Sequence, residues 1–296
     1  MEATKNTKIT KNKTRPTTPW SIAFNRLKRD KSAMVGLYIV IFLIFVAIFA
    51  PIISPYDPIE DFDLKNALEG PSKDHWFGTD WMGRDLFSRV VYGSRISLTV
   101  GLFSRVVTLG IGIPLGALAG YYGGKVDMVI MRIAEIMDAF PTFLFAIVIS
   151  VAIGPGLYTV FFALGFVGWS GMCRMIRGQV LALRDVEFVE AAKSLGASDA
   201  EIIFKEILPN CMAPVIISTT MGISGAIMSE AGLSFLGLGA QPPTATWGSM
   251  IEYGRKYFIS ASHLVIFPGI AIALTVYGFN LFGDGLRDAL DPRMDD

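Results

Sequence analysis

The chain has 296 residues, of which 52% are hydrophobic, and its 26 basic side chains balance its 26 acidic ones. Its mean hydropathy is +0.49. A soluble domain of this length needs far less apolar surface, so the composition excludes a soluble protein and predicts a polytopic membrane protein.

Apolar stretches of about 20 residues, the length that spans a bilayer, recur along the chain. Pro114, Pro141 and Gly165 interrupt some of them, which is tolerated where neighbouring helices satisfy the freed backbone groups. We therefore predict an all-α membrane protein with about six transmembrane helices. The expected spans are residues 34–53, 96–121, 133–153, 157–172, 214–236 and 264–282.

Basic residues before the first span set the orientation. Lys and Arg are frequent between residues 5 and 31, and such residues mark the cytoplasmic side. Residues 1–33 are therefore predicted to be a cytoplasmic basic tail, disordered by composition, and counting spans from there puts both termini inside. Anionic lipid explains this basic strip without nucleic acid. A cleaved signal peptide is disfavoured because the apolar run is too long and Pro51 follows the only plausible small-residue site.

Residues 54–95 form the longest segment on the predicted outer side, and it is rich in Asp and Glu. It begins as a glycine-broken loop and becomes an amphipathic helix. The apolar residues of that helix are expected to lie on the membrane, and Asp85 is expected to pair with Arg89. The apolar residues in question are Leu86, Phe87, Val90 and Val91.

Glycines at 112, 116, 120 and 124 recur every four residues in the second span. On a helix this spacing gives one smooth stripe, which allows a second helix to approach closely. The stripe is read either as plain packing or as a joint that transmits movement, and packing is favoured.

A second small-residue stripe runs from Ser218 to Ser234 in the fifth span and contains Glu230. A charge facing lipid costs about 2.5 to 3.5 kcal/mol, so Glu230 is expected to face inward. Two readings are open: Glu230 and Ser234 line the translocation path, or Glu230 lies near the outer headgroups and bonds a neighbouring loop. Glu135 and Asp138 pose the same question in the third span, where pairing with Arg132 or a basic loop is favoured.

A polar, amphipathic hairpin separates the fourth and fifth spans. Asp185 is expected to cap its first helix and Gly196 to end it. Ser198 and Glu201 have the spacing of a capping box for a second helix, which Pro209 should end. The apolar face of the first helix is expected to contain Val186, Val189, Ala192 and Leu195. From periodicity alone, this hairpin is either a docking surface or an ordinary loop lying on the bilayer.

The hairpin resembles the EAA loop of bacterial ABC-importer permeases. The matching residues are Glu190, Ala191, Ala192, Gly196, Leu208 and Pro209. In that family the loop inserts into a cleft on the cytoplasmic ATPase. One departure is Glu206, which stands where the family usually carries Ile, and it puts the detailed contact pattern in doubt.

Four further segments resemble the C-type permease subunits of dipeptide and oligopeptide importers, and the resemblance covers nearly everything after Ser32. The matching segments are residues 75–98, 237–248, 279–281 and 283–292. The resemblance implies the architecture of an ABC type I importer permease of the MetI kind in a bacterial inner membrane. It divides the chain into a first helix at 34–53, an external loop at 54–95, a core at 96–283 with its coupling loop at 184–210, and a cytoplasmic tail at 284–296.

The same resemblance implies the partners. They are a B-type permease that completes the path, two cytoplasmic ATPase subunits and an extracytoplasmic substrate-binding protein. ATP and Mg are then held by the ATPases, and no cofactor is held by this chain. Peptides are the expected substrate, and nickel, glutathione or antimicrobial peptides are alternatives within the family.

Other functional classes lack their motifs. Gly124-Lys125 is followed by Val126 and has no glycine at the required earlier position, so no phosphate-binding loop is present. No zinc-binding His-Glu-x-x-His helix and no Gly-x-Ser-x-Gly elbow occur. Cys173 and Cys211 read as reduced packing residues, and the histidines at 75 and 263 as unsuited to a metal site. An intramembrane enzyme is therefore disfavoured, and the EAA-like hairpin argues against a passive channel.

Overall fold

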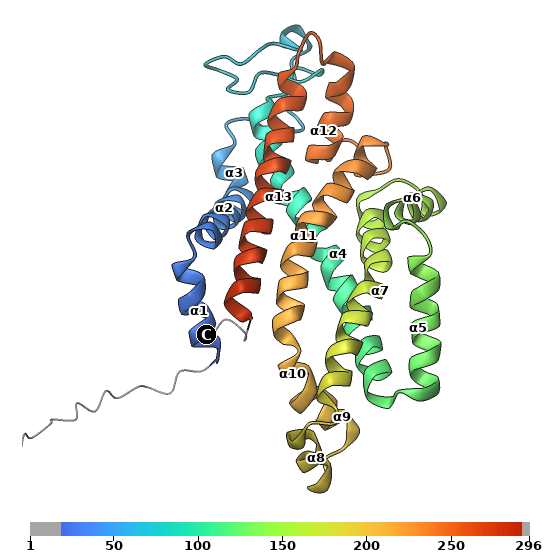
Figure 1. The fold of residues 1–296 in the computed structure, drawn as a ribbon. Helices are drawn as coiled ribbons and strands as arrows, with labels where there is room; N and C mark the ends of the chain where they lie inside the picture. The colour runs from blue at the N-terminus through green and yellow to red at the C-terminus, as the bar shows by residue number, and fades with distance from the viewer. Residues whose placement is uncertain (1–18, 292–296) are drawn as a thin grey trace, which may run out of the picture.

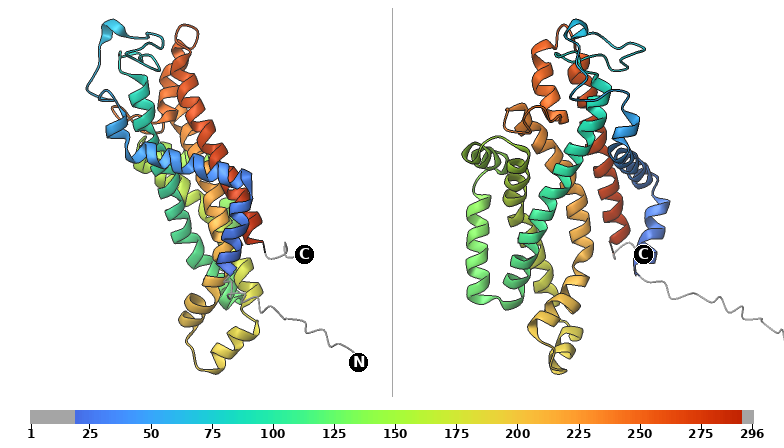
Figure 2. Two further views of the ribbon diagram at one scale, coloured as in Figure 1. Left: turned by 90° about the vertical axis from the view of Figure 1, so that its left-hand side faces the viewer. Right: turned by 180° about the vertical axis from the view of Figure 1, so that it is seen from behind.

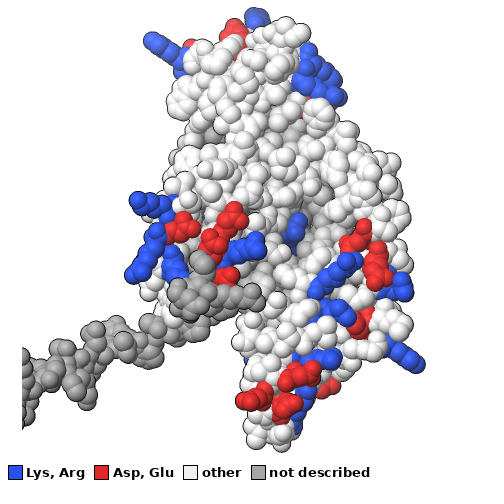
Figure 3. All heavy atoms as spheres, in the orientation of Figure 1, with Lys and Arg blue, Asp and Glu red and all other residues white. Residues whose placement is uncertain are grey.

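The computed structural model describes residues 19–291, and the regular secondary structure in that range is helical, apart from one isolated bridge between Thr79 and Asp85. Its long helices run side by side (Figure 1). At one end lies an outer cap, formed by residues 54–85 and 237–262, and at the other end the hairpin at residues 184–210 protrudes. Charged side chains gather at the two ends of the face shown in Figure 3, and the band between them is almost uncharged. This division is the one expected of a protein that crosses a bilayer.

Among the described residues, five helices are long and apolar enough to cross a membrane, namely α2, α4, α7, α11 and α13, and the bent pair α5 and α6 makes a sixth span if it is counted as one. The helices are α1 Pro19–Arg29, α2 Lys31–Ile48, α3 Ala50–Ile53, α4 Leu86–Tyr122, α5 Gly124–Asp138, α6 Thr142–Ile153, α7 Leu157–Leu183, α8 Glu187–Ser194, α9 Asp199–Glu201, α10 Leu208–Asn210, α11 Met212–Phe235, α12 Trp247–Gly254 and α13 His263–Leu290. Short 3-10 turns cover Leu64–Asn66 and Arg255–Tyr257, and a π-helical segment covers Ile202–Ile207.

The prediction of one continuous third span at 133–153 is wrong. The chain there forms α5 and α6, which meet at an angle of 86°. Pro141 stands directly before α6. Proline lacks the N–H that would continue the helix and disfavours helical backbone at the residue before it, so the break falls at this position.

The first apolar run is also divided, at Phe49, between α2 and the short α3. Helix α2 crosses α13 obliquely instead of running parallel to it (Figure 2). Glycines permit the crossing. A Cβ on Gly36 would lie 2.8 Å from the carbonyl oxygen of Gly278, which is too close, so only glycine fits at this contact between α2 and α13. Helix α1 and the last turns of α13 lie toward the hairpin end of the molecule (Figure 2). Of the tail predicted at residues 1–33, residues 1–18 lie outside the described residues. The prediction of disorder is wrong for the rest, because residues 19–29 form α1, whose Leu27 packs with Ala289 of α13, and Asp30 caps α2.

The close helix approach expected from the glycine stripe is confirmed, and the partner is α7. An added Cβ would lie 2.7 Å from Met172 at Gly112, 2.5 Å from the carbonyl oxygen of Cys173 at Gly116, and 2.7 Å from Val180 at Gly120. Gly124 falls outside the joint because it begins α5. Three glycines therefore bring α4 and α7 to backbone contact over two helical turns.

At the outer end, the structure corrects two expectations about the start of α4. Leu86 and Val90 do not lie on a membrane surface, because they are buried with Trp247 and Met250 in a common core. The Trp247 indole N–H donates to the carbonyl oxygen of Val90 at 2.9 Å. The expected amphipathic helix is thus the first part of α4, held beneath the outer cap.

Asp85 does not pair with Arg89. Its carboxylate caps α4 by accepting the backbone N–H of Ser88 at 2.7 Å, and it also lies 2.9 Å from His75 Nδ1. Arg89 lies instead 3.3 Å from Asp80 and donates to the carbonyl oxygen of Pro58 at 2.7 Å. Asp85 is therefore the helix cap, and Asp80 is the acid that holds the buried arginines.

Candidate functional site

The first helix of the cytoplasmic hairpin, α8, ends as the sequence predicts. Gly196 has φ +84. Its N–H donates to the carbonyl of Lys193 at 3.0 Å, and the N–H of Ala197 donates to that of Ala192 at 3.1 Å. These two bonds form a Schellman motif, which requires left-handed backbone and so favours glycine. At the other end the prediction is wrong: Val186 precedes α8 without a side-chain cap, and Asp185 pairs with Arg184 at 3.2 Å.

The capping box of the second helix is confirmed. The Ser198 hydroxyl accepts the N–H of Glu201 at 3.3 Å, and the Glu201 carboxylate accepts the N–H of Ser198 at 3.2 Å. Lys205, together with the N–H and hydroxyl of Ser198, lowers the pKa of Glu201 to about 2. The box therefore keeps its charge throughout the physiological pH range.

Pro209 does not end this helix. It lies in the first turn of α10, where a missing N–H costs little, and the chain continues through Cys211 into α11. Between α9 and α10 the backbone forms a π-helical segment, and its isoleucines at 202, 203 and 207 are buried. The hairpin is therefore joined to α11 by nearly continuous helix, and its second half cannot move separately from that span without unwinding.

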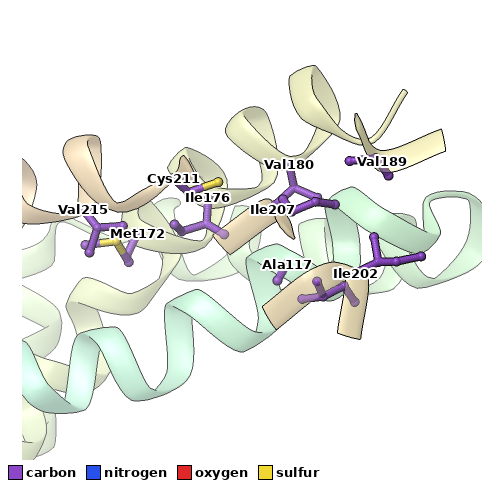
Figure 4. Close-up of a cluster of buried hydrophobic side chains, with 10 residues drawn as sticks. Ala117, Met172, Ile176, Val180, Val189, Ile202, Ile207, Cys211 and Val215 are labelled. Atoms are coloured by element: carbon purple, nitrogen blue, oxygen red, sulfur yellow. The ribbon is translucent and has the colours of Figure 1, made fainter. Parts of the chain in front are cut away.

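The inner side of the hairpin packs on the cytoplasmic ends of α4 and α7. Val189, Ile202 and Ile207 meet Ile176 and Val180 in one buried cluster (Figure 4). Polar bonds add to this anchor. The Tyr121 hydroxyl donates to Asp199 at 2.9 Å, and Arg184 donates to the carbonyl of Gly120 at 3.2 Å. The hairpin is therefore fixed to three spanning helices, and a force on it reaches all three.

The outer side of the hairpin exposes apolar groups in an otherwise charged surface. Leu195 is 89% exposed and Phe204 is 67% exposed. Of the residues expected to share the apolar face of the first helix, only Val189 is buried, and Val186 and Leu195 are exposed because α8 spans only Glu187–Ser194. Of the resemblance residues, Glu190, Ala191, Gly196 and Pro209 are exposed, whereas Ala192 and Leu208 are half-buried. These exposed apolar groups make the outer side of the hairpin a candidate docking surface.

The second candidate site surrounds Glu230, which is fully buried in α11. The Ser234 hydroxyl donates to Glu230 Oε1 at 2.7 Å and lies 3.4 Å from the hydroxyl of Thr246, which caps α12. Within residues 19–291, Glu230 Oε2 has no hydrogen-bond partner. The carboxylate thus faces protein, as its stripe predicts, and lies beneath the outer cap.

We expect Glu230→Gln to leave the yield of the assembled transporter normal and to change uptake or basal ATPase activity. Gln keeps the size and the bond to Ser234, but that bond is no longer charge-assisted and weakens by about 1 kcal/mol, roughly fivefold in rate if the bond changes during transport. Glu252→Gln, on α12, is the matched control. Loss of the assembled complex would assign Glu230 a structural role, and unchanged uptake would show that its charge has no part in transport.

The acids of the third span have structural partners. Glu135 pairs with Arg132 at 3.0 Å, as favoured from the sequence. Asp138 accepts the Ser170 hydroxyl at 2.5 Å and pairs with Arg174 of α7. Asp138 therefore ties the end of α5 to α7, whereas the pair of Glu135 and Arg132 lies within α5.

The sequence reading missed Arg105, which lies in the middle of α4 within a stretch treated as apolar. The structure places its guanidinium against Gly222 of α11, where an added Cβ would lie 2.6 Å from Nη1. The available signal was simple: one charge inside an apolar span is costly and marks a candidate functional residue.

A cavity of about 700 Å³ opens between the cytoplasmic halves of α7, α11 and α13. Its lining includes Gln179, Ser218, Met221 and Arg287. Ser218 belongs to the small-residue stripe of α11, so the stripe faces this open space at its inner end and the outer cap at Glu230. No group of three or more His, Cys, Asp and Glu residues placed to hold a metal occurs in residues 19–291.

Comparison with known proteins agrees with this architecture. Residues 112–296 match the model of the family described as binding-protein-dependent transport system inner membrane components. Residues 18–71 match the model of the N-terminal transmembrane domain of oligopeptide transport permease C.

Curated relatives match over almost their whole length. The dipeptide transport system permease protein DppC of Alkalihalophilus pseudofirmus is 49% identical over 93% of this chain and 90% of its own. The glutathione transport system permease protein GsiD of Escherichia coli is 47% identical over 94% of this chain and 91% of its own. The dipeptide transport system permease protein DppC of Bacillus subtilis is 45% identical over 92% of this chain and 85% of its own.

A solved structure of inward-facing conformations of the MetNI methionine ABC transporter contains a chain of the same fold. The TM-score is 0.55 at 19% identity, and the match covers 69% of this chain and 96% of that one. The expected MetI-like permease architecture is thereby confirmed. With a family match over most of its length and close relatives matched from end to end, this chain belongs to the binding-protein-dependent transport system inner membrane components, as a multi-pass permease of the bacterial inner membrane.

Proposed function

We propose that this chain is the C-type membrane subunit of an ATP-driven importer of di- or oligopeptides. A B-type permease completes the translocation path, two cytoplasmic ATPase subunits bind ATP and Mg, and an extracytoplasmic protein delivers the substrate. The family supports the transport role, and two relatives are named for a dipeptide and for glutathione, itself a small peptide.

One observation carries the coupling role: the hairpin is anchored by its inner side and apolar on its outer side. Leu195 and Phe204 offer an apolar surface to an ATPase cleft, while the buried cluster at Ile176 and Val180 ties the hairpin to the spans. Closure of the ATPases on ATP moves the hairpin as a rigid element. Because α4, α7 and α11 are attached to it, the spans then shift between inward-open and outward-open states.

The test is uptake of a labelled dipeptide by the complete transporter in proteoliposomes. Uptake should require both ATP and the binding protein. Flux without ATP would support a passive channel instead, and turnover of a substrate by the purified chain alone would support an enzyme.

The outer loop is proposed to meet the binding protein. Trp81 of this loop is half-buried, and its ring centroid lies 5.6 Å from that of Tyr253. Trp76 is 59% exposed and is therefore the better position for cross-linking.

A photo-cross-linker at Trp76 should capture the binding protein, because exposed aromatic residues suit a wet, transient interface. The same group at Phe204 is the matched control and should capture an ATPase subunit instead. If the two positions exchange partners, the proposed orientation is wrong.

A further inference from the structure

Arg105 is the single charged residue between Ile96 and Tyr121 of α4. It lies ten residues beyond Arg95, or about 15 Å along the helix at 1.5 Å per residue. Arg95 directly precedes the apolar span expected at residues 96–121 and so marks its outer edge. Since 15 Å is half the thickness of a bilayer core of about 30 Å, Arg105 lies near the membrane midplane.

The guanidinium has no protein partner in the described part of the chain. Arg105 forms no ion pair or hydrogen bond there, and its Nε is buried without an acceptor. On α11, the hydroxyl of Thr219 is also buried without a partner, one helical turn before Gly222. Unpaired buried donors are costly, and a charged one at this depth is retained where it serves a function.

Glycines make the space in which the guanidinium lies. An added Cβ on Gly222 of α11 would lie 2.6 Å from Arg105 Nη1, and one on Gly168 of α7 would lie 3.9 Å from the same atom. The guanidinium therefore lies where α4 faces α7 and α11, away from lipid. Ser218, one turn from Gly222 on α11, lines the inner cavity, so the same face of α11 leads from Arg105 to that open space.

We infer that Arg105 is a transient binding site for a carboxylate of the transported peptide at the membrane midplane. The planar guanidinium offers paired N–H donors that match a carboxylate, and the Thr219 hydroxyl is a further free donor on the facing helix. Every peptide with a free C-terminus carries this group. The inference rests on the proposed function, because it requires that the cargo be a peptide.

The experiment measures maximal dipeptide uptake by the complete transporter at saturating loaded binding protein. Arg105→Gln should lower the maximal rate about tenfold or more, the effect of losing a charge-assisted bond. The concentration of binding protein that gives half-maximal uptake should stay unchanged, since docking occurs at the outer surface. Arg105→Lys should restore part of the rate because it keeps the charge without the paired donors.

A second pair of variants leaves the arginine in place. Gly222→Ala puts a methyl group into the guanidinium, whose flexible end can move aside without unfolding the helix. Gly225→Ala on the same helix meets nothing within 4 Å and is the matched control. We expect Gly222→Ala to slow maximal uptake severalfold and Gly225→Ala to transport at the normal rate.

Two results would overturn the site. Normal maximal uptake by Arg105→Gln would show that the charge does not meet cargo. Loss of the B-type permease from purified Arg105→Gln complexes, with normal uptake by those that form, would show that a carboxylate of the neighbouring subunit is the partner. If the unmodified transporter imports no peptide at all, the proposed function itself fails, and this assignment fails with it.

Discussion

Leu195→Asp should uncouple the transporter, so that peptide uptake falls at least about tenfold while the subunit still inserts and assembles. An apolar residue in the centre of an interface contributes about 2 kcal/mol or more, and a carboxylate there adds a desolvation cost. Leu195 is 89% exposed, so its replacement removes little that holds the hairpin together. The measurement is ATP-dependent uptake together with the amount of ATPase that copurifies.

Leu195→Met is the conservative control and should transport normally. Glu190→Arg, on the exposed side of α8, should act in the same direction as Leu195→Asp. Gly196→Pro changes the shape instead, because proline cannot adopt φ +84 and lacks the N–H that bonds Lys193. Normal import by both Leu195→Asp and Gly196→Pro would contradict the docking assignment.

Asp80→Ala should destabilise the outer cap by about 3 to 5 kcal/mol, because removing one partner leaves buried charges uncompensated. The buried carboxylate of Asp80 lies 2.7 Å from Arg84 and 3.3 Å from Arg89, and it accepts the N–H of Met82 at 2.8 Å. Both arginines are also buried, and the variant leaves them without this counter-charge.

The measurement is the melting temperature of the purified transporter and the protease resistance of residues 54–85. Asp74→Ala is the control, since Asp74 lies on the same loop and is exposed. An unchanged melting temperature for Asp80→Ala would show that the cap does not depend on this ion cluster.

Features that depend on local backbone chemistry could be predicted from the sequence. The stop at Gly196 and the capping box at Ser198 are set by a few neighbouring residues, and both are confirmed. The glycine stripe of α4 likewise predicts a close helix approach, although not that α7 is the partner.

Features that depend on distant contacts could not be predicted. Val186 and Leu195 follow the helical period of Val189, yet only Val189 meets the core on α4 and α7. Asp85 has Arg89 at helical spacing, but His75 and the first turn of α4 compete for it. The break at Pro141 was visible in the sequence, but neither its 86° angle nor the contact of Asp138 with Ser170 of α7 was, because both involve residues distant in the chain.

The uninterrupted length of α4 has a mechanical consequence. Its 37 residues extend about 55 Å. They run from the core beneath the outer cap to Tyr121, whose hydroxyl donates to Asp199 of the hairpin. A rod of this kind connects the two aqueous compartments directly, so a tilt imposed at one end displaces the other without any chain of small rearrangements between them. If ATPases move the hairpin as proposed, the tilt of α4 would reach the outer cap directly, and α7 would move with α4 through the glycine contact.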